Sequence, residues 1–115
     1  MDSERRQVPR YVAELPAMVL RPGGGPAIQV MVASLSIQGC AVEGAGSLKP
    51  NEDVELQIEW EGSEFHADAS VAWKSSKGEI GLRFLYIDQR NQDLLRKICS
   101  NLRMQPLRPI SQDQP

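Results

Sequence analysis

The sequence predicts a mainly β protein, a small antiparallel barrel or sandwich closed by one helix at its C-terminal end. Three successive segments in the middle of the chain alternate apolar and polar residues with a period of two, which is typical of half-buried antiparallel strands. Toward the C-terminus the spacing of apolar residues changes to that of an amphipathic helix. The 115 residues are enough for one domain with a core of its own.

The alternating segments define the three clearest strands. Their apolar positions are Val54, Leu56, Ile58 and Trp60, then Phe65, Ala67, Ala69, Val71 and Trp73, and finally Ile80, Leu82, Phe84 and Tyr86. Turn-forming residues at 61–62 and 75–78 separate the three segments. The alternation predicts that Trp60 and Trp73 face the core rather than a ligand.

Three further strands are expected earlier in the chain. Residues 11–20 are apolar enough for a strand, in which Pro16 indicates either an edge position or a bulge. The turn-forming sequence RPGGGP at 21–26 leads to a second strand at 27–34, and a third follows at 40–43. The six strands together suggest a small antiparallel barrel or sandwich.

A helix is predicted over residues 89–103, with Asp88 as its N-cap. The apolar residues at helical spacing are Leu94, Leu95, Ile98 and Leu102. Because they form a single stripe, we expect the helix to lie on an open end of the barrel. The charged segment 1–10 is predicted to be a flexible arm and the proline-containing segment 104–115 a disordered tail, which leaves 11–103 as the folded domain.

Composition excludes several classes of protein. A net charge of -2 does not suit a general binder of nucleic acid polymers, and no apolar run is long enough to span a membrane. The charged N-terminus lacks the apolar region of a secretory signal, so we expect a cytoplasmic protein, and a barrel of this size is expected to be a monomer. Cys40 and Cys99 are interpreted as reduced thiols, although the sequence leaves a disulfide between them open.

The charges are unevenly distributed along the chain. Residues 43–68 contain eight acidic residues and one lysine, whereas residues 69–115 contain eight basic and four acidic residues. An anionic ligand would therefore meet the ends of the chain rather than its middle. The simpler interpretation of the acidic block is a solvated surface.

Two short motifs are candidates for binding chemistry, one basic and one a turn. The residues involved are Arg5, Arg6 and Arg10 in the first and Ser34, Ser36 and Gly39 in the second. Taken singly, a basic arm is most often solvated, and a turn of serine and glycine most often only connects two strands. Their functional interpretation depends on whether the fold brings them together.

Hairpin register predicts that the fold brings the two motifs together. If the first two strands form a hairpin centred between Gly23 and Gly24, position 10 faces position 37. Guanidinium groups bind phosphate oxygens bidentately, read the O6/N7 edge of guanine or stack on its ring. Serine hydroxyls can donate to or accept from exocyclic groups. The combination suits a ligand that carries phosphates and a purine.

The order of the motifs resembles that of PilZ domains. Arg6-x-x-x-Arg10 followed by Ser34-x-Ser36-x-x-Gly39 resembles their RxxxR and (D/N)xSxxG motifs, and VAW at 71–73 and GLRF at 81–84 resemble their last two strands. The resemblance covers about residues 5–103. It implies a bacterial six-stranded antiparallel β-barrel with a C-terminal α-helix. It also implies a receptor for cyclic di-GMP that is not an enzyme, needs no cofactor or metal, and signals to a partner protein in motility or biofilm formation.

The resemblance also implies roles for single residues. Arg6 and Arg10 would contact phosphates and guanine, Ser36 and Gly39 would form the floor of the site, and Arg5 would favour a stacked pair of the dinucleotide. Ser34 departs from the family pattern of Asp or Asn. Its shorter side chain could cost about 1–3 kcal/mol, or one to two decades of affinity, so Ser34→Asp should tighten binding.

Alternatives from other classes are also open. Ser34 would suit a PilZ-like adaptor that has lost the ligand and works through protein contacts in pilus assembly or motility, although both motif arginines are retained. A barrel that binds single-stranded RNA would need a basic groove with exposed aromatic residues, and aromatic residues make up 5% of the chain. His66, the only histidine, is expected to face solvent and lacks partners for a metal site or a catalytic triad.

Overall fold

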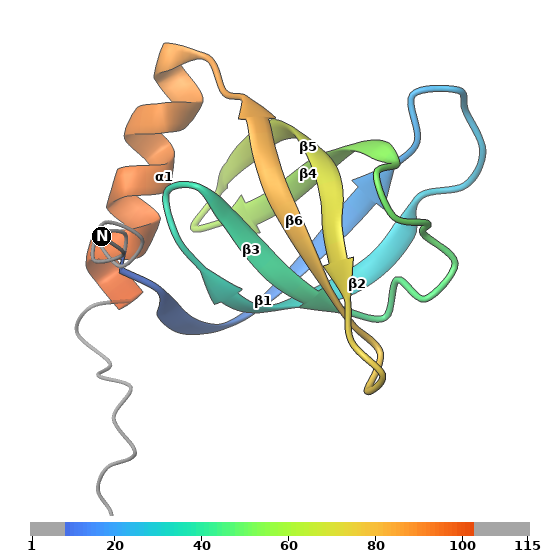
Figure 1. Cartoon of the computed structure of the whole chain (residues 1–115). Coiled ribbons are helices and arrows are strands. Elements are labelled where there is room, and N and C mark those ends of the chain that lie inside the picture. The colour runs from blue at the N-terminus through green and yellow to red at the C-terminus, as the bar shows by residue number, and fades with distance from the viewer. Residues whose placement is uncertain (1–8, 103–115) are drawn as a thin grey trace, which may run out of the picture.

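The computed structural model describes residues 9–102, which form six strands and one helix. Their bounds are β1 Tyr11–Leu20, β2 Ile28–Leu35, β3 Gly39–Glu43, β4 Asp53–Trp60, β5 Ser63–Lys74, β6 Glu79–Tyr86 and α1 Gln89–Leu102. Neighbouring strands are antiparallel, and the order β1-β2-β3-β6-β5-β4 closes into a barrel where β1 pairs with β4 (Figure 1). The predicted six-stranded barrel with a C-terminal helix is confirmed. The predictions for residues 1–8 and 103–115 lie outside the described residues.

The β1–β2 hairpin follows the expected register over most of its length. Leu15 pairs with Val32 as predicted, but a bulge then shifts the register, and Tyr11 pairs with Leu35. The prediction that position 10 faces position 37 is therefore wrong by one residue. Pro16 lies beside this bulge and pairs with Met31 of β2, while the β1–β4 pairing begins one residue later, at Ala17.

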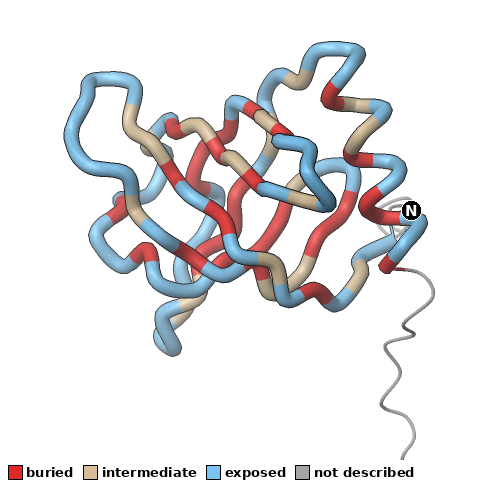
Figure 2. The backbone as a smooth tube through the Cα atoms, turned by 180° about the vertical axis from the view of Figure 1, so that it is seen from behind, coloured by how far each residue is buried: buried red, intermediate tan, exposed pale blue. Residues whose placement is uncertain are grey.

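Inward-facing side chains from all six strands fill the barrel. Fully buried examples are Val19, Val32, Leu35, Val42, Leu56, Ile58, Phe65, Val71 and Ile80. The rings of Phe65 and Phe84 lie with their centroids 5.9 Å apart at a tilted angle, which is a favourable aromatic arrangement. Figure 2 shows the buried positions along the barrel wall and the exposed loops around it. Removal of this apolar surface from water is the main stabilising contribution to the fold.

The helix α1 begins at its predicted cap and covers one end of the barrel (Figure 1). The Asp88 carboxylate accepts a hydrogen bond from the backbone N–H of Asn91 at 2.9 Å. Leu95 and Ile98 are buried against the core, and the helix contacts β1 and β5. The Asn91 side chain in turn accepts a hydrogen bond from the backbone N–H of His66 at 2.9 Å, which ties β5 to the start of the helix.

Two aromatic residues lie differently from their predicted positions, and bulges explain both. Trp73 was expected in the core, but a bulge between Val71 and Trp73 shifts the alternation by one, so the indole faces outward and is 41% exposed. A second irregularity between Asp68 and Ala69 leaves Tyr86 64% exposed at the end of β6. Trp60 is partly buried against the core, as predicted.

The barrel end opposite α1 carries a loop at residues 44–52 that is fixed by charged side chains. Leu48 is fully buried beneath this loop. Arg21 at the end of β1 donates to the Glu52 carboxylate at 2.6 Å, and Lys74 donates to the carbonyl oxygen of Leu48 at 2.8 Å. The Glu52 carboxylate also accepts a hydrogen bond from the backbone of Lys49 at 3.0 Å. These charged groups therefore serve the fold.

Candidate functional site

The turn between β2 and β3 is closed by the Ser36 side chain. Its Oγ accepts hydrogen bonds from the backbone N–H groups of Gln38 and Gly39, at 3.1 and 3.2 Å, and donates to the Gly39 carbonyl oxygen at 3.3 Å. The residue is only 6% exposed. One donor and two acceptor positions are all that a hydroxyl offers. Ser36 therefore shapes the turn rather than presenting a hydroxyl to solvent.

Gly39 is required because β6 passes very close to it. A Cβ added at this position would overlap the backbone carbonyl oxygen of Leu82. Gly81, two pairs along the same ladder, is covered in a similar way by the Trp73 indole, which a Cβ there would overlap. These two glycines keep the outer face of β3 and β6 flat and let the indole lie directly against the sheet.

Arg10 and Ser34 are in contact. The guanidinium of Arg10 donates to Ser34 Oγ at 3.2 Å, across the start of β1 and the end of β2. Arg10 of the first motif therefore meets Ser34 of the second at the barrel end covered by α1, as hairpin register predicted for Arg10. Arg5 and Arg6 belong to the segment outside the described residues.

A shallow cavity of about 270 Å³ lies beside this contact on the outer face of the barrel. Its lining includes Arg10, Ser36, Gly39, Trp73, Gly81 and Arg83. Within the described part of the chain, no carboxylate lines it, and two guanidinium groups do. Such a wall favours an anion, and the exposed indole adds a face on which a planar ring can stack.

Sequence reasoning missed Trp73 and Arg83 as parts of this cavity. Arg83 lies on β6 directly opposite Gly39 in the β3–β6 pairing, which brings a residue from late in the chain to the predicted turn. The motif GLRF at 81–84 contains Arg83, but a polar residue in an alternating strand looks the same whether it serves a site or only solvent.

The Cys40 thiol beside the cavity has a strongly shifted pKa. Burial raises the pKa of the Cys40 thiol to about 12, so the thiol stays protonated and is a poor nucleophile. Cys40 and Cys99 are both buried and are not joined by a disulfide. Across residues 9–102, no cluster of histidine, cysteine and acidic side chains is arranged to hold a metal ion.

His66 differs from its predicted place in solvent. It is partly buried, with Nδ1 3.0 Å from a Glu55 oxygen and Nε2 3.2 Å from a Glu64 oxygen. Hydrogen bonding to Glu55, and secondarily to Glu64, raises the pKa of the imidazole.

Within residues 9–102, no helix has the length and apolar character needed to span a bilayer.

The family model that matches this chain is that of the PilZ domain, and the match extends over residues 4–101. The chain belongs to the PilZ family. No curated protein sequence matches it. Solved structures that resemble this PilZ domain agree with the assignment and share its fold.

Three of these structures illustrate the range. The PilZ domain of YcgR from Escherichia coli, solved with cyclic di-GMP, has a TM-score of 0.71 at 16% identity, with 87% of this chain and 92% of that chain covered. The PilZ domain of CeSA from a cellulose-synthesizing bacterium gives 0.68 at 18% identity, with 83% and 98% covered. The motility inhibitor MotI of Bacillus subtilis gives 0.70 at 22% identity, with 90% of this chain and 54% of that chain covered. The chain thus spans nearly all of two of these structures and about half of the third.

Proposed function

We propose that this PilZ domain is a receptor for cyclic di-GMP that signals by changing the surface it presents to a partner protein. The observation that carries the proposal is the cavity at the start of β1, where Arg10 bonds Ser34 beside Arg83 and the exposed Trp73 indole. Phosphates suit the two guanidinium groups, and a guanine ring suits the indole face.

The remaining motif residues complete the proposed site. Arg5 and Arg6 precede Arg10 by five and four positions, and a chain extends at most about 3.6 Å per residue, so both side chains can reach the same cavity. We assign them to the phosphates and guanine edges. Ser36 and Gly39 act through the shape of the turn, since the Ser36 hydroxyl is already bonded within it.

Two observations support a receptor rather than an enzyme. The similar PilZ domain of E. coli YcgR was solved with cyclic di-GMP, which is a ligand. In this chain the cavity lining includes two guanidinium groups, a thiol that burial keeps protonated and the Ser36 hydroxyl, which is already bonded within the turn. These groups favour binding of an anion over general-base or nucleophilic chemistry. Binding followed by protein contact is the function that this set of groups supports.

Isothermal titration of the full chain with cyclic di-GMP tests the proposal, with GTP and cyclic di-AMP as competitors of related chemistry. We expect micromolar or tighter binding that is selective for the guanine dinucleotide. Arg10→Ala should abolish it, whereas Arg90→Ala, the same change at an exposed position of α1, should leave it intact. The melting temperature of both variants should stay close to that of the parent chain.

The absence of heat would overturn the receptor function, provided that excess ligand also leaves the melting temperature unchanged. The outcome would favour the adaptor that acts through protein contacts alone. Normal binding by Arg10→Ala would instead mean that the ligand lies away from this cavity.

A further inference from the structure

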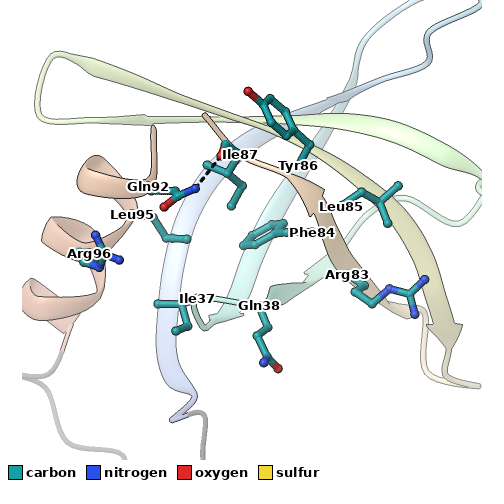
Figure 3. Close-up of a pocket in the computed structure, with 10 residues that line it drawn as sticks. All are labelled: Ile37, Gln38, Arg83, Phe84, Leu85, Tyr86, Ile87, Gln92, Leu95 and Arg96. Carbon is teal, nitrogen blue, oxygen red and sulfur yellow. Dashed lines mark hydrogen bonds between the residues drawn. The ribbon is translucent and has the colours of Figure 1, made fainter. Parts of the chain in front are cut away.

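A second and larger cavity lies on the other side of the β2–β3 turn, between α1 and β6. Its volume is about 510 Å³, and we call it the α1–β6 groove. Residues that define it are Ile37, Phe84, Leu85, Leu95, Arg83 and Arg96. In Figure 3, Ile37, Phe84 and Leu95 point toward one another from the turn, the strand and the helix, while Arg83 and Leu85 form the far rim.

The groove exposes three large apolar side chains. Ile37 and Leu85 are each 52% exposed, and Tyr86 is 64% exposed. All three line the same cavity. Contiguous exposed apolar surface of this kind marks an interaction site more often than an accident of folding.

The charges around the groove select the kind of partner. Its only charged lining residues within 9–102 are Arg83 and Arg96. The cavity on the outer face of β1, β2 and β4 has the opposite character, since it is lined by Glu43, Glu59 and Glu64 with no basic residue from the described chain. In a protein of net charge -2, the groove is therefore a local positive site.

Arg96 remains available to a partner. Its nearest carboxylate in the described chain is that of Asp93, one turn earlier on α1, at 3.5 Å. Both side chains are more than half exposed, and pairs of this kind contribute little. A carboxylate presented by a docked segment can replace or share this contact.

We propose that the α1–β6 groove docks an acidic amphipathic segment of a partner protein. Apolar side chains of the segment would enter between Phe84 and Leu95, and its carboxylates would reach Arg83 and Arg96. The charge complementarity excludes a basic segment from the same surface, which is where specificity would arise.

The groove and the cyclic di-GMP cavity share one wall. The backbone N–H of Phe84 donates to the carbonyl oxygen of Gln38 at 2.9 Å. This hydrogen bond connects the floor of the groove to the β2–β3 turn of the ligand site. Gln38 and Arg83 line both cavities. If the proposed function is correct, on which this step rests, ligand phosphates compete with the acidic segment for Arg83, and the two bind antagonistically.

Two displayed peptide libraries test the docking proposal without cyclic di-GMP. In one, apolar positions alternate with aspartate and glutamate at helical spacing. In the other, lysine and arginine replace the acidic positions. We expect enrichment from the acidic library only, with peptides that bind the full chain at roughly micromolar affinity.

Matched variants then locate the peptides. Arg96→Glu should weaken an enriched peptide at least about fivefold and Leu85→Ser about tenfold. Lys97→Glu, the same charge change one residue along α1, and Met31→Ser, an exposed apolar residue on the acidic face, should each change affinity less than twofold, roughly. Circular dichroism melting of all four variants checks that they remain folded.

Several results would overturn the docking proposal. These are enrichment from neither library, equal enrichment from both, or full binding by Arg96→Glu and Leu85→Ser. Self-association of the chain that Arg96→Glu abolishes, measured by light scattering, would mean that a second copy occupies the groove.

The coupling has its own test. Saturating cyclic di-GMP should weaken the peptide about three- to fivefold in the parent chain and leave it unchanged in Arg10→Ala. An unchanged affinity in a chain that demonstrably binds cyclic di-GMP would disprove the coupling alone, whereas a chain that does not bind cyclic di-GMP would disprove the proposed function and leave the groove standing.

Discussion

The two ends of the barrel use similar side chains for opposite purposes. At the end that carries the 44–52 loop, Arg21 and Lys74 are bonded to a carboxylate and to backbone carbonyl oxygens of that loop. At the end covered by α1, Arg10 contacts a single serine hydroxyl, and Arg83 has no carboxylate partner among residues 9–102. Cations that are satisfied within the fold hold loops, and cations that are left open are available to a ligand.

The two ends of the barrel also differ in how far their apolar side chains are buried. The loop end buries Leu48 completely, whereas Ile37 at the α1 end is 52% exposed. Local departures from the most stable arrangement are expected where a protein binds something. Stability and binding should therefore separate between the two ends when each is mutated.

The largest expected effect is on stability at the loop end. Leu48→Ala removes a fully buried side chain and should lower the free energy of unfolding by about 2–5 kcal/mol, measured by urea denaturation. Affinity of the folded fraction for cyclic di-GMP should be unchanged. Ser47→Ala, at the exposed neighbouring position, is the control and should stay near the parent value. A Leu48→Ala protein as stable as this control would show that the loop contributes little to the fold.

Gly39→Ala should affect both properties, because the turn belongs to the fold and to the site. The added methyl group would overlap the Leu82 carbonyl oxygen, and overpacking of this kind costs about 1–3 kcal/mol. Moving β3 away from β6 would also separate the turn from Arg83 and weaken ligand binding. Gly23→Ala provides the comparison, since nothing lies within 4 Å of a Cβ there and its φ is not positive. Equal behaviour of the two variants in melting and in titration would contradict the role assigned to Gly39.

Ser34→Asp at the α1 end should change ligand affinity without changing stability. A carboxylate at this position reaches further than a hydroxyl and restores the family motif. Ligand affinity should rise by about one to two decades, equivalent to about 1–3 kcal/mol, while stability stays nearly constant. Ser47→Asp at the opposite end adds the same charge and should leave affinity unchanged. Titration calorimetry on both variants decides, and an unchanged affinity for Ser34→Asp would show that the site is arranged differently.

The smallest expected effect is on the pH dependence of stability, which should have opposite signs at the two ends. The hydrogen bond from Arg21 lowers the pKa of Glu52 below its ordinary 4.5, so this stabilisation is present above that pH and is lost as the pH falls. Hydrogen bonding to Glu55 raises the pKa of His66 above its ordinary 6.5, so its stabilisation is present below pH 6.5 and is lost as the pH rises through the folded-state pKa.

Melting curves recorded across the acid and neutral ranges test these signs. Arg21→Gln should flatten the decline in melting temperature on the acid side, and His66→Gln should flatten the decline on the neutral side. Each variant serves as the control of the other. A parallel change in both limbs from either substitution would mean that the pH dependence arises elsewhere.

The barrel could be predicted from the sequence because the signals for its strands, turns and helix cap lie in neighbouring residues. The positions of β4 and β5 in the chain, the turn residues between them and the Asp88 cap each depend on neighbouring positions, and the structure confirms them. The sequence also predicted that Arg10 approaches the Ser34 turn, since hairpin register needs only the length of one loop.

The errors have a common cause in long-range pairing. The outward position of Trp73 depends on a bulge opposite β6, and a bulge leaves no mark in the alternation of its own strand. Arg83 joins the site only because β3 pairs with β6, a strand much later in the chain, which places Arg83 opposite Gly39. Neither relation is encoded within a window of a few residues.

The most direct test of the two-ended account is a nuclear magnetic resonance titration of the uniformly labelled chain with cyclic di-GMP. We expect the largest amide shifts at residues 34–39 and at Arg83, with a shift of the Trp73 indole N–H. The amides of the 44–52 loop should stay in place, and so should the indole of Trp60, which does not line the cavity. Shifts confined to the 44–52 loop, or a Trp60 response without one from Trp73, would contradict the account.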